Sequence, residues 1–64
     1  MRATYDSEAN ALYVRFSEAA IVETEELRPG LIVDFDKEGR IVGLEMLNAR
    51  AQLPADALKS VAAA

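Results

Sequence analysis

The sequence contains no cysteine and no histidine. The first absence excludes disulfides and thiolate metal sites, and the second removes the commonest general base and transition-metal ligand. No apolar run approaches the roughly 18 residues of a membrane span, and residues 1–6 lack the apolar core of a signal peptide. We therefore expect a cytoplasmic protein that is not an enzyme, with no cofactor, no metal and no membrane partner.

The chain has 64 residues, which predicts one small domain over residues 1–64. A domain of this size buries only about 60% of the surface that its unfolded chain exposes, so its core is marginal. Small domains are usually supplemented by a disulfide, a metal or a partner subunit, and only the last remains here. The sequence thus predicts a homo-oligomer. Its net charge of −4 argues against nucleic acid as a partner.

Alternation of apolar and polar side chains is the main structural signal, and it predicts strands at about 2–6, 11–16, 21–27, 31–35 and 40–47. Asn10, in the turn before the second strand, tolerates a left-handed conformation. Residues 21–28 fit either a strand or an irregular segment. They are too few for a stable helix and end at Pro29 and Gly30, so a solvent-facing strand is favoured.

The stretch from residue 31 to residue 47 predicts a hairpin whose type I turn begins at Asp36 and ends at Gly39. A four-residue connection places Phe35 opposite Arg40 and Val33 opposite Val42. This register collects one apolar set on one face: Leu31, Val33, Phe35, Val42, Leu44 and Met46. The opposite face carries Ile32, Ile41 and Leu47, so both faces need a cover.

A C-terminal helix at about 54–62 is the predicted cover of the first face. Pro54 suits an early helical position, and Leu53, Ala57, Leu58 and Val61 form one helical stripe. The fold class is therefore α+β, an antiparallel β-meander of four to five strands with one short helix packed on one face. A second copy is the predicted cover of the other face, through Tyr13, Ile32, Ile41 and Leu47.

The hairpin also carries a calcium-like spacing. Asp34, Asp36, Glu38, Gly39 and Glu45 occupy positions 1, 3, 5, 6 and 12 of a calcium loop, with Glu at the fifth position as the one departure. Strands rather than helices flank it, and Glu45 would lie roughly 17 Å along the strand from the turn. An acidic turn is favoured, and a calcium-binding module is the weaker alternative. Catalysis by Asp34 and Glu45 lacks a nucleophile and a pocket, so no catalytic residue is expected.

Acidic residues concentrate between residues 17 and 38. This stretch contains seven acidic residues and only two basic ones, Arg28 and Lys37. One interpretation is a solvated strand that protects a sheet edge from aggregation. The other is a surface for a small basic protein, such as a toxin. Its candidate residues are Glu23, Glu25, Glu26 and Asp34.

Several motifs in order resemble the small bacterial family called domain of unknown function 2283. They are Tyr5-Asp6, the run from Glu8 to Val14, Thr24-Glu25-Glu26, Val33-Asp34-Phe35-Asp36 with Gly39, and Ile41-Val42-Gly43-Leu44-Glu45 with Leu47 and Ala49. The resemblance covers roughly residues 5–49, with Asn10 where the family commonly has Asp and Phe35 where Tyr is common. It implies a strand-rich domain without an established activity, some of whose members resemble antitoxins. From the residues we expect a self-associating interaction module. The alternative, to which the resemblance points, is an antitoxin-like acidic binder of a small basic toxin.

Overall fold

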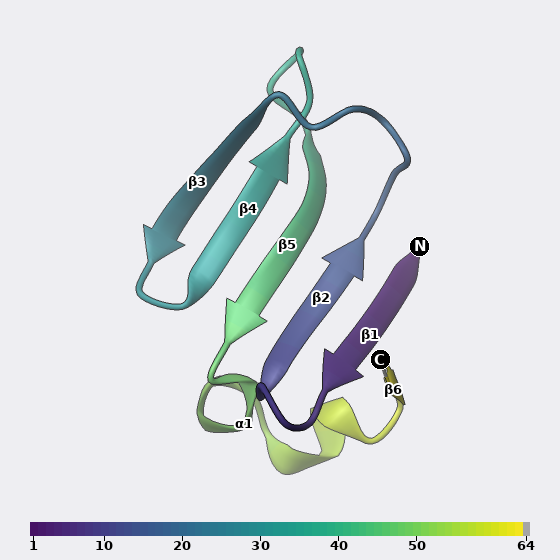
Figure 1. Ribbon diagram of the computed structural model, residues 1–64, viewed down its shortest axis with the longest axis vertical. Helices are drawn as coiled ribbons and strands as arrows, with labels where there is room; N and C mark the ends of the chain where they lie inside the picture. Colours follow the sequence, from purple (N-terminus) through teal and green to yellow (C-terminus); the bar gives the residue numbers. More distant parts are fainter. Residues whose placement is uncertain (64) are drawn as a thin grey trace.

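The computed structural model describes residues 1–63 and contains one sheet in the order β3-β4-β5-β2-β1-β6 (Figure 1). The elements in chain order are β1 Arg2–Asp6, β2 Ala11–Arg15, β3 Glu23–Arg28, β4 Leu31–Phe35, β5 Ile41–Leu47, α1 Ala49–Gln52, the 3-10 helix η1 Ala55–Leu58, and β6 Ala62–Ala63. β1 to β5 pair antiparallel, while the two-residue β6 pairs parallel with β1. The predicted α+β class with five antiparallel strands is confirmed.

β5 lies at the centre of the antiparallel strands, between β4 and β2. The meander is therefore interrupted once, because residues 16–22 carry the chain from β2 past the ends of β5 and β4 to β3 (Figure 1). The most buried large side chain belongs to this central strand: Val42 is 2% exposed. Each predicted strand lies within two residues of an observed one, and residues 21–28 are indeed mostly strand.

The predicted pairing of β4 with β5 is wrong by two residues. Val33 lies opposite Leu44, not Val42, and Phe35 lies opposite Ile41, not Arg40. One residue of the difference comes from the turn, where the Asp36 N–H donates to the Arg40 carbonyl at 2.9 Å. The other comes from a β-bulge that leaves Val42 unpaired with β4. A shift of one residue would move the side chains of a strand to the other face of the sheet. The two shifts cancel in this respect, so the predicted apolar set still lies on one face.

The predicted short C-terminal helix is present, but its predicted bounds of about 54–62 are wrong, because α1 spans Ala49–Gln52 and a separate 3-10 helix follows it. α1 ends at Gln52, and Leu53 is extended with φ −123° and ψ 152°. A residue before proline is disfavoured in the α region, and Pro54 follows. η1 then gives one 3-10 turn, and residues 62 and 63 are extended because they pair with β1. No helix within residues 1–63 has the length and apolar content needed to cross a membrane.

Hydrogen bonds hold this segment to the β1–β2 turn. Asn10 and Asn48 both have positive φ, 55° and 53°, and the Asn10 side-chain amide donates to the Asn48 side-chain oxygen at 3.1 Å. The Ala49 N–H donates to the Asn10 carbonyl, and the Arg50 N–H donates to the Asn10 side-chain oxygen, each at 3.0 Å. Consequently α1 and η1 lie beyond one end of the strands rather than across the sheet (Figure 1).

Candidate functional site

One face of the sheet carries almost only apolar side chains. The strand registers bring together Ala3 and Tyr5 of β1, Leu12 and Val14 of β2, Leu31, Val33 and Phe35 of β4, and Val42, Leu44 and Met46 of β5. We call this set the apolar face. Most of its members are half-buried, and only Leu12, Val33 and Val42 are fully buried. Viewed down the shortest axis of the molecule, the middle of the sheet is crossed by no other described segment (Figure 1).

The shape of the molecule agrees with an uncovered face. Its accessible surface is 4400 Å², whereas a compact monomer of 7.0 kDa exposes about 4,000 Å². Strands lie about 4.8 Å apart and rise about 3.4 Å per residue, so the apolar face covers roughly 300 Å² in plan. Contiguous apolar patches of a few hundred Å² are frequently interaction sites.

Charges of opposite sign border the apolar face at two separate places. On the β3 side, Glu23 lies opposite Phe35 and Glu25 lies opposite Val33, which places both carboxylates on this face. On the β1 side, Arg50 and Lys59 line a groove next to Tyr5. The face is therefore apolar in the middle, acidic along the β3 edge and basic at the end where β1 meets η1.

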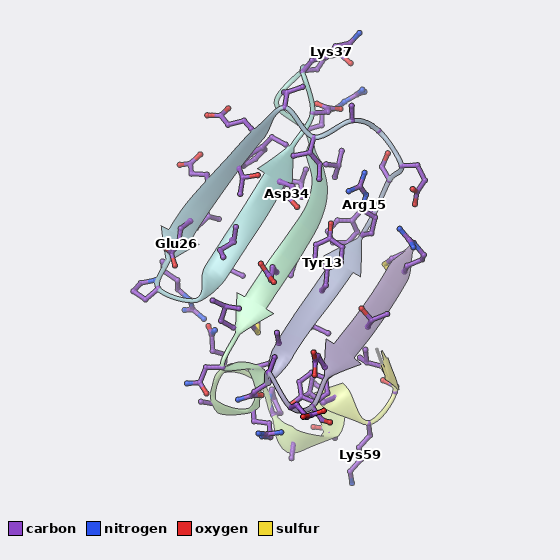
Figure 2. All side chains as sticks on the ribbon, in the orientation of Figure 1. Tyr13, Arg15, Glu26, Asp34, Lys37 and Lys59 are labelled. Atoms are coloured by element: carbon purple, nitrogen blue, oxygen red, sulfur yellow. The ribbon has the colours of Figure 1, made fainter. Side chains whose placement is uncertain are left out.

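The opposite face is polar, and its side chains form a row across four strands that we call the polar row: Thr24 of β3, Asp34 of β4, Gly43 of β5, and Tyr13 and Arg15 of β2 (Figure 2). The Thr24 hydroxyl donates to Asp34 Oδ1 at 2.8 Å. A Cβ on Gly43 would lie 3.2 Å from the Tyr13 hydroxyl and 3.5 Å from Asp34 Oδ2. Both polar groups thus converge over the space that Gly43 leaves open.

Arg15 connects the polar row to the segment between β2 and β3. Its Nη1 donates to the Tyr13 hydroxyl at 3.4 Å, its Nε to the Ser17 carbonyl at 2.6 Å and its Nη2 to the Ala19 carbonyl at 2.9 Å. The hydrogen bond with Tyr13 raises the pKa of Arg15 above its ordinary value, against a smaller opposing effect of burial. The guanidinium therefore stays charged and fixes residues 17–19 against the sheet.

The residues expected to form an interface do not all share one surface. Tyr13 and Ile32 flank Glu45 on the polar face, and Leu47 lies on that face too, 41% exposed. Ile41 lies opposite Phe35 at the bulge and is 53% exposed. The polar face is accordingly less apolar than the sequence suggested, because Glu45 stands in its middle.

The predicted acidic surface is likewise divided between two faces. Strand alternation places Glu23 and Glu25 on the apolar face, and Glu26, opposite Ile32, on the polar face together with Asp34. Figure 2 shows Glu26 at the outer edge of the sheet and Asp34 nearer its middle. What unites Glu23, Glu25 and Glu26 is the outer edge of β3, where every residue of the strand is exposed.

The carboxylates of the calcium-like spacing do not converge. Asp34 accepts from Thr24, Glu38 accepts from Arg40 Nη2 at 2.7 Å, and Glu45 lies on β5 between Tyr13 and Ile32. Among residues 1–63, no three Asp or Glu side chains form a group able to hold a metal ion. The spacing is a by-product of the turn chemistry.

Asp36 closes that turn and is 8% exposed. Its Oδ1 accepts the backbone N–H groups of Arg40 and Glu38, each at 2.9 Å, and its Oδ2 accepts Arg40 Nε at 3.0 Å. The backbone hydrogen bond from Arg40, reinforced by that from Glu38 and by the Arg40 side chain, lowers the pKa of Asp36 below its ordinary 3.8. Asp36 is therefore a structural acid, fully engaged in holding β4 to β5.

A family model described as a protein of unknown function, DUF2283, matches residues 2–50. The chain belongs to DUF2283. The match ends within α1, so this DUF2283 domain consists of the five antiparallel strands and the segment that begins α1. Searches of curated proteins and of solved structures found no match to the chain.

Sequence reasoning missed two features of this DUF2283 domain. The polar row was not predicted. An isolated glycine in a strand often marks a place where another group approaches the backbone closely, and Gly43 is such a glycine, since the Tyr13 hydroxyl lies next to it. The groove beside Tyr5 was not found either. It depends on Asn10 and Asn48, which lie far apart in sequence and whose contact no local pattern indicates.

Proposed function

We propose that this DUF2283 domain is a non-enzymatic interaction module that self-associates by packing the apolar faces of two copies together. The single observation that supports this is the uncovered apolar face, on which only Leu12, Val33 and Val42 are fully buried. Two sheets that pack face to face lie about 10 Å apart and share one core. Each copy would thereby supply half of a shared core. A single chain of 64 residues buries too little apolar surface to form a large core by itself.

The charged borders favour one orientation of the two copies. A two-fold axis perpendicular to the strands would place β3 over β3 and bring Glu23 and Glu25 toward their own symmetry mates. An axis parallel to the strands places β3 of one copy over β1 of the other and so keeps these like charges apart. Like charges that face each other across an interface cost free energy. The parallel axis is therefore the arrangement that we propose.

Sedimentation and thermal unfolding of the wild-type protein test this proposal directly. We expect a dimer by sedimentation equilibrium at about 100 µM, and a Tm that rises with protein concentration, because association stabilises only the folded state. A monomer at this concentration whose Tm does not change with dilution would sink the proposal. This test uses no substitution and so cannot be confused with misfolding.

A matched pair of substitutions then distinguishes the two faces. Leu44→Gln introduces an amide into the apolar face, and Ile32→Gln introduces the same group into the polar face. A buried leucine contributes about 1.5–3 kcal/mol, and each substitution occurs twice in a two-fold interface. We expect Leu44→Gln to weaken dimerisation at least tenfold while Ile32→Gln leaves it unchanged, with far-UV circular dichroism as the folding control. The reverse result would assign association to the polar face.

A second candidate function is supported by the outer edge of β3. This edge is unpaired among the described residues, all six residues of the strand are exposed, and it carries Glu23, Glu25 and Glu26. A strand from another protein can pair with such an edge and form main-chain hydrogen bonds with its backbone N–H and C=O groups. Lysines or arginines on that strand would meet carboxylates on both sides of the sheet. We infer from this an antitoxin-like binder of a small basic protein.

Binding to the product of an adjacent reading frame, if that product is small and basic, tests the second candidate. Glu23→Gln with Glu25→Gln should weaken the complex and reduce its dependence on salt, since surface charge steers such associations. Glu8→Gln with Asp56→Asn removes the same charge on the β1 side of the sheet, away from β3, and should leave binding unchanged. Equal effects of the two double variants would show that only net charge matters and would exclude the β3 edge.

A further inference from the structure

A groove of about 380 Å³ lies where η1 approaches β1, separate from the polar row. Its lining consists of Tyr5, Ala55 and Leu58 together with the two cationic residues Arg50 and Lys59. A volume of this size falls in the range of small-molecule sites, which are mostly apolar with a few placed polar groups. The groove has that composition: an aromatic ring and two aliphatic side chains, with positive charge beside them.

The guanidinium of Arg50 is held in place by the protein. Its Nη1 donates to the Tyr5 hydroxyl at 2.9 Å and to the Ser7 carbonyl at 3.4 Å. The Tyr5 hydroxyl in turn donates to the Asn10 side-chain oxygen at 2.7 Å. Because these contacts engage Nη1, the Nη2 and Nε groups remain as donors for a ligand. A side chain that is already fixed loses little conformational freedom when it binds.

The charge of the groove is opposite to that of the whole chain. The protein has a net charge of −4, yet none of the ion pairs within residues 1–63 involves Arg50 or Lys59. The described ion pairs use Arg2 and Arg40 instead. No carboxylate of the described chain lines the groove or forms an ion pair with either cation, which indicates that the complementary charge comes from a ligand.

We propose that this groove binds a small amphipathic carboxylate, of the class of medium-chain fatty acids. Its hydrocarbon chain lies against Leu58, Ala55 and the Tyr5 ring, and its carboxylate accepts hydrogen bonds from Arg50 and Lys59. Arginine is suited to carboxylates because its planar fork can donate two parallel hydrogen bonds. This site goes beyond self-association. It shares Tyr5 with the apolar face, but its other lining residues lie in or next to α1 and η1, beyond the end of the strands.

Titration of the ¹⁵N-labelled protein with octanoate, followed by amide chemical shifts, tests the proposal. We expect saturable shifts confined to Tyr5, Arg50, Leu58 and their neighbours. Octanamide has the same chain without the charge and should bind at least tenfold more weakly. Hexanoate should also bind about tenfold more weakly than octanoate, because each buried methylene contributes about 0.8 kcal/mol. Absence of saturable shifts, or equal affinity for octanoate and octanamide, overturns the proposal.

Two lysines provide a matched pair of variants. Lys59 borders the groove, whereas Lys37 lies in the β4–β5 turn at the opposite end of the molecule (Figure 2). Lys59→Gln should weaken octanoate binding three- to tenfold, and Lys37→Gln, which removes the same charge, should leave it unchanged. Leu58→Ala should weaken octanoate binding while preserving its advantage over octanamide. If Lys59→Gln and Lys37→Gln bind octanoate equally, Lys59 does not hold the carboxylate and the proposed site is wrong.

Discussion

At the scale of single residues, the missing Cβ of Gly43 shapes the polar face. A Cβ at this position would lie 3.1 Å from the Val14 carbonyl and 3.2 Å from the Tyr13 hydroxyl, closer than ordinary van der Waals contact. Tyr13 can therefore lie over β5, between Arg15 and Asp34, only because position 43 carries no side chain. Gly43 pairs with Arg15 on one side and Asp34 on the other, so the row of polar side chains is organised around it.

The substitution Gly43→Ala should destabilise the domain. The Cβ displaces the Tyr13 hydroxyl and presses on the backbone of β2, and small-to-large changes of this kind cost about 1–3 kcal/mol. Relief of the entropy cost of glycine offsets about 0.5–1 kcal/mol. A net loss of about 1 kcal/mol lowers the Tm of a domain this small by about 4–8 °C, measurable by circular dichroism.

The control for this prediction is a double-mutant cycle with Tyr13→Phe. If the crowded group is the Tyr13 hydroxyl, Gly43→Ala costs less in the Tyr13→Phe background, with a coupling of at least about 0.5 kcal/mol. Additive effects of the two substitutions would contradict the contact between these positions.

Asp36 predicts a specific dependence of stability on pH. Its pKa in the folded protein lies below the ordinary 3.8, because Arg40 and Glu38 donate to the ionised carboxylate. Between these two pKa values the unfolded chain binds more protons than the folded one, so stability rises with pH there. The contribution of Asp36 is fully present above the unfolded pKa and is lost as the pH falls through the folded pKa.

We therefore expect Asp36→Asn to reduce the loss of unfolding free energy between pH 7 and pH 3, measured by urea unfolding. Asp56→Asn, at an exposed position on η1, is the matched control and should show the wild-type loss. If all three proteins lose the same free energy over this interval, Asp36 does not contribute in the way described.

At the scale of elements, the strands follow from side-chain alternation, and the details depend on contacts that alternation does not record. The faces of β4 and β5 were predictable because apolar residues at 31, 33, 42, 44 and 46 keep a period of two. The partners were not, because the bulge at Val42 adds a residue without changing the pattern beyond it. The turn shifted the pairing by one more residue, because Asp36 pairs with Arg40 and does not lie inside the loop.

The C-terminal segment shows where local reasoning failed. Leu53, Leu58 and Val61 have helical spacing, yet Pro54 holds Leu53 extended, and the pairing of residues 62 and 63 with β1 draws the chain away from a helix. About ten residues gain little from helix formation alone, so tertiary pairing decides their conformation. The basic groove escaped prediction for the same reason, because Tyr5, Arg50 and Lys59 meet only through this pairing and the Asn10 contacts.

At the scale of the whole molecule, the domain is an open sheet with extents of 34 × 23 × 18 Å and a radius of gyration of 11.9 Å. A compact chain of this length has a radius of gyration of about 10.7 Å. The larger radius of gyration is expected for a single open sheet, which is less compact than a domain built from packed layers. On the polar face, the side chains of Tyr13, Arg15 and Asp34 form hydrogen bonds within the protein. No segment of the described chain covers the middle of the apolar face, which is why we propose that association uses it.

The short strand β6 has a consequence for how the protein behaves at high concentration. It covers part of the outer edge of β1 at Thr4 and Tyr5, while the other outer edge, β3, carries Glu23, Glu25 and Glu26. Edge-to-edge growth of sheets into fibres needs two open and compatible edges. Here one edge is partly capped and the other carries charges that repel its own kind, so both edges oppose edge-to-edge growth of the sheet into polymers.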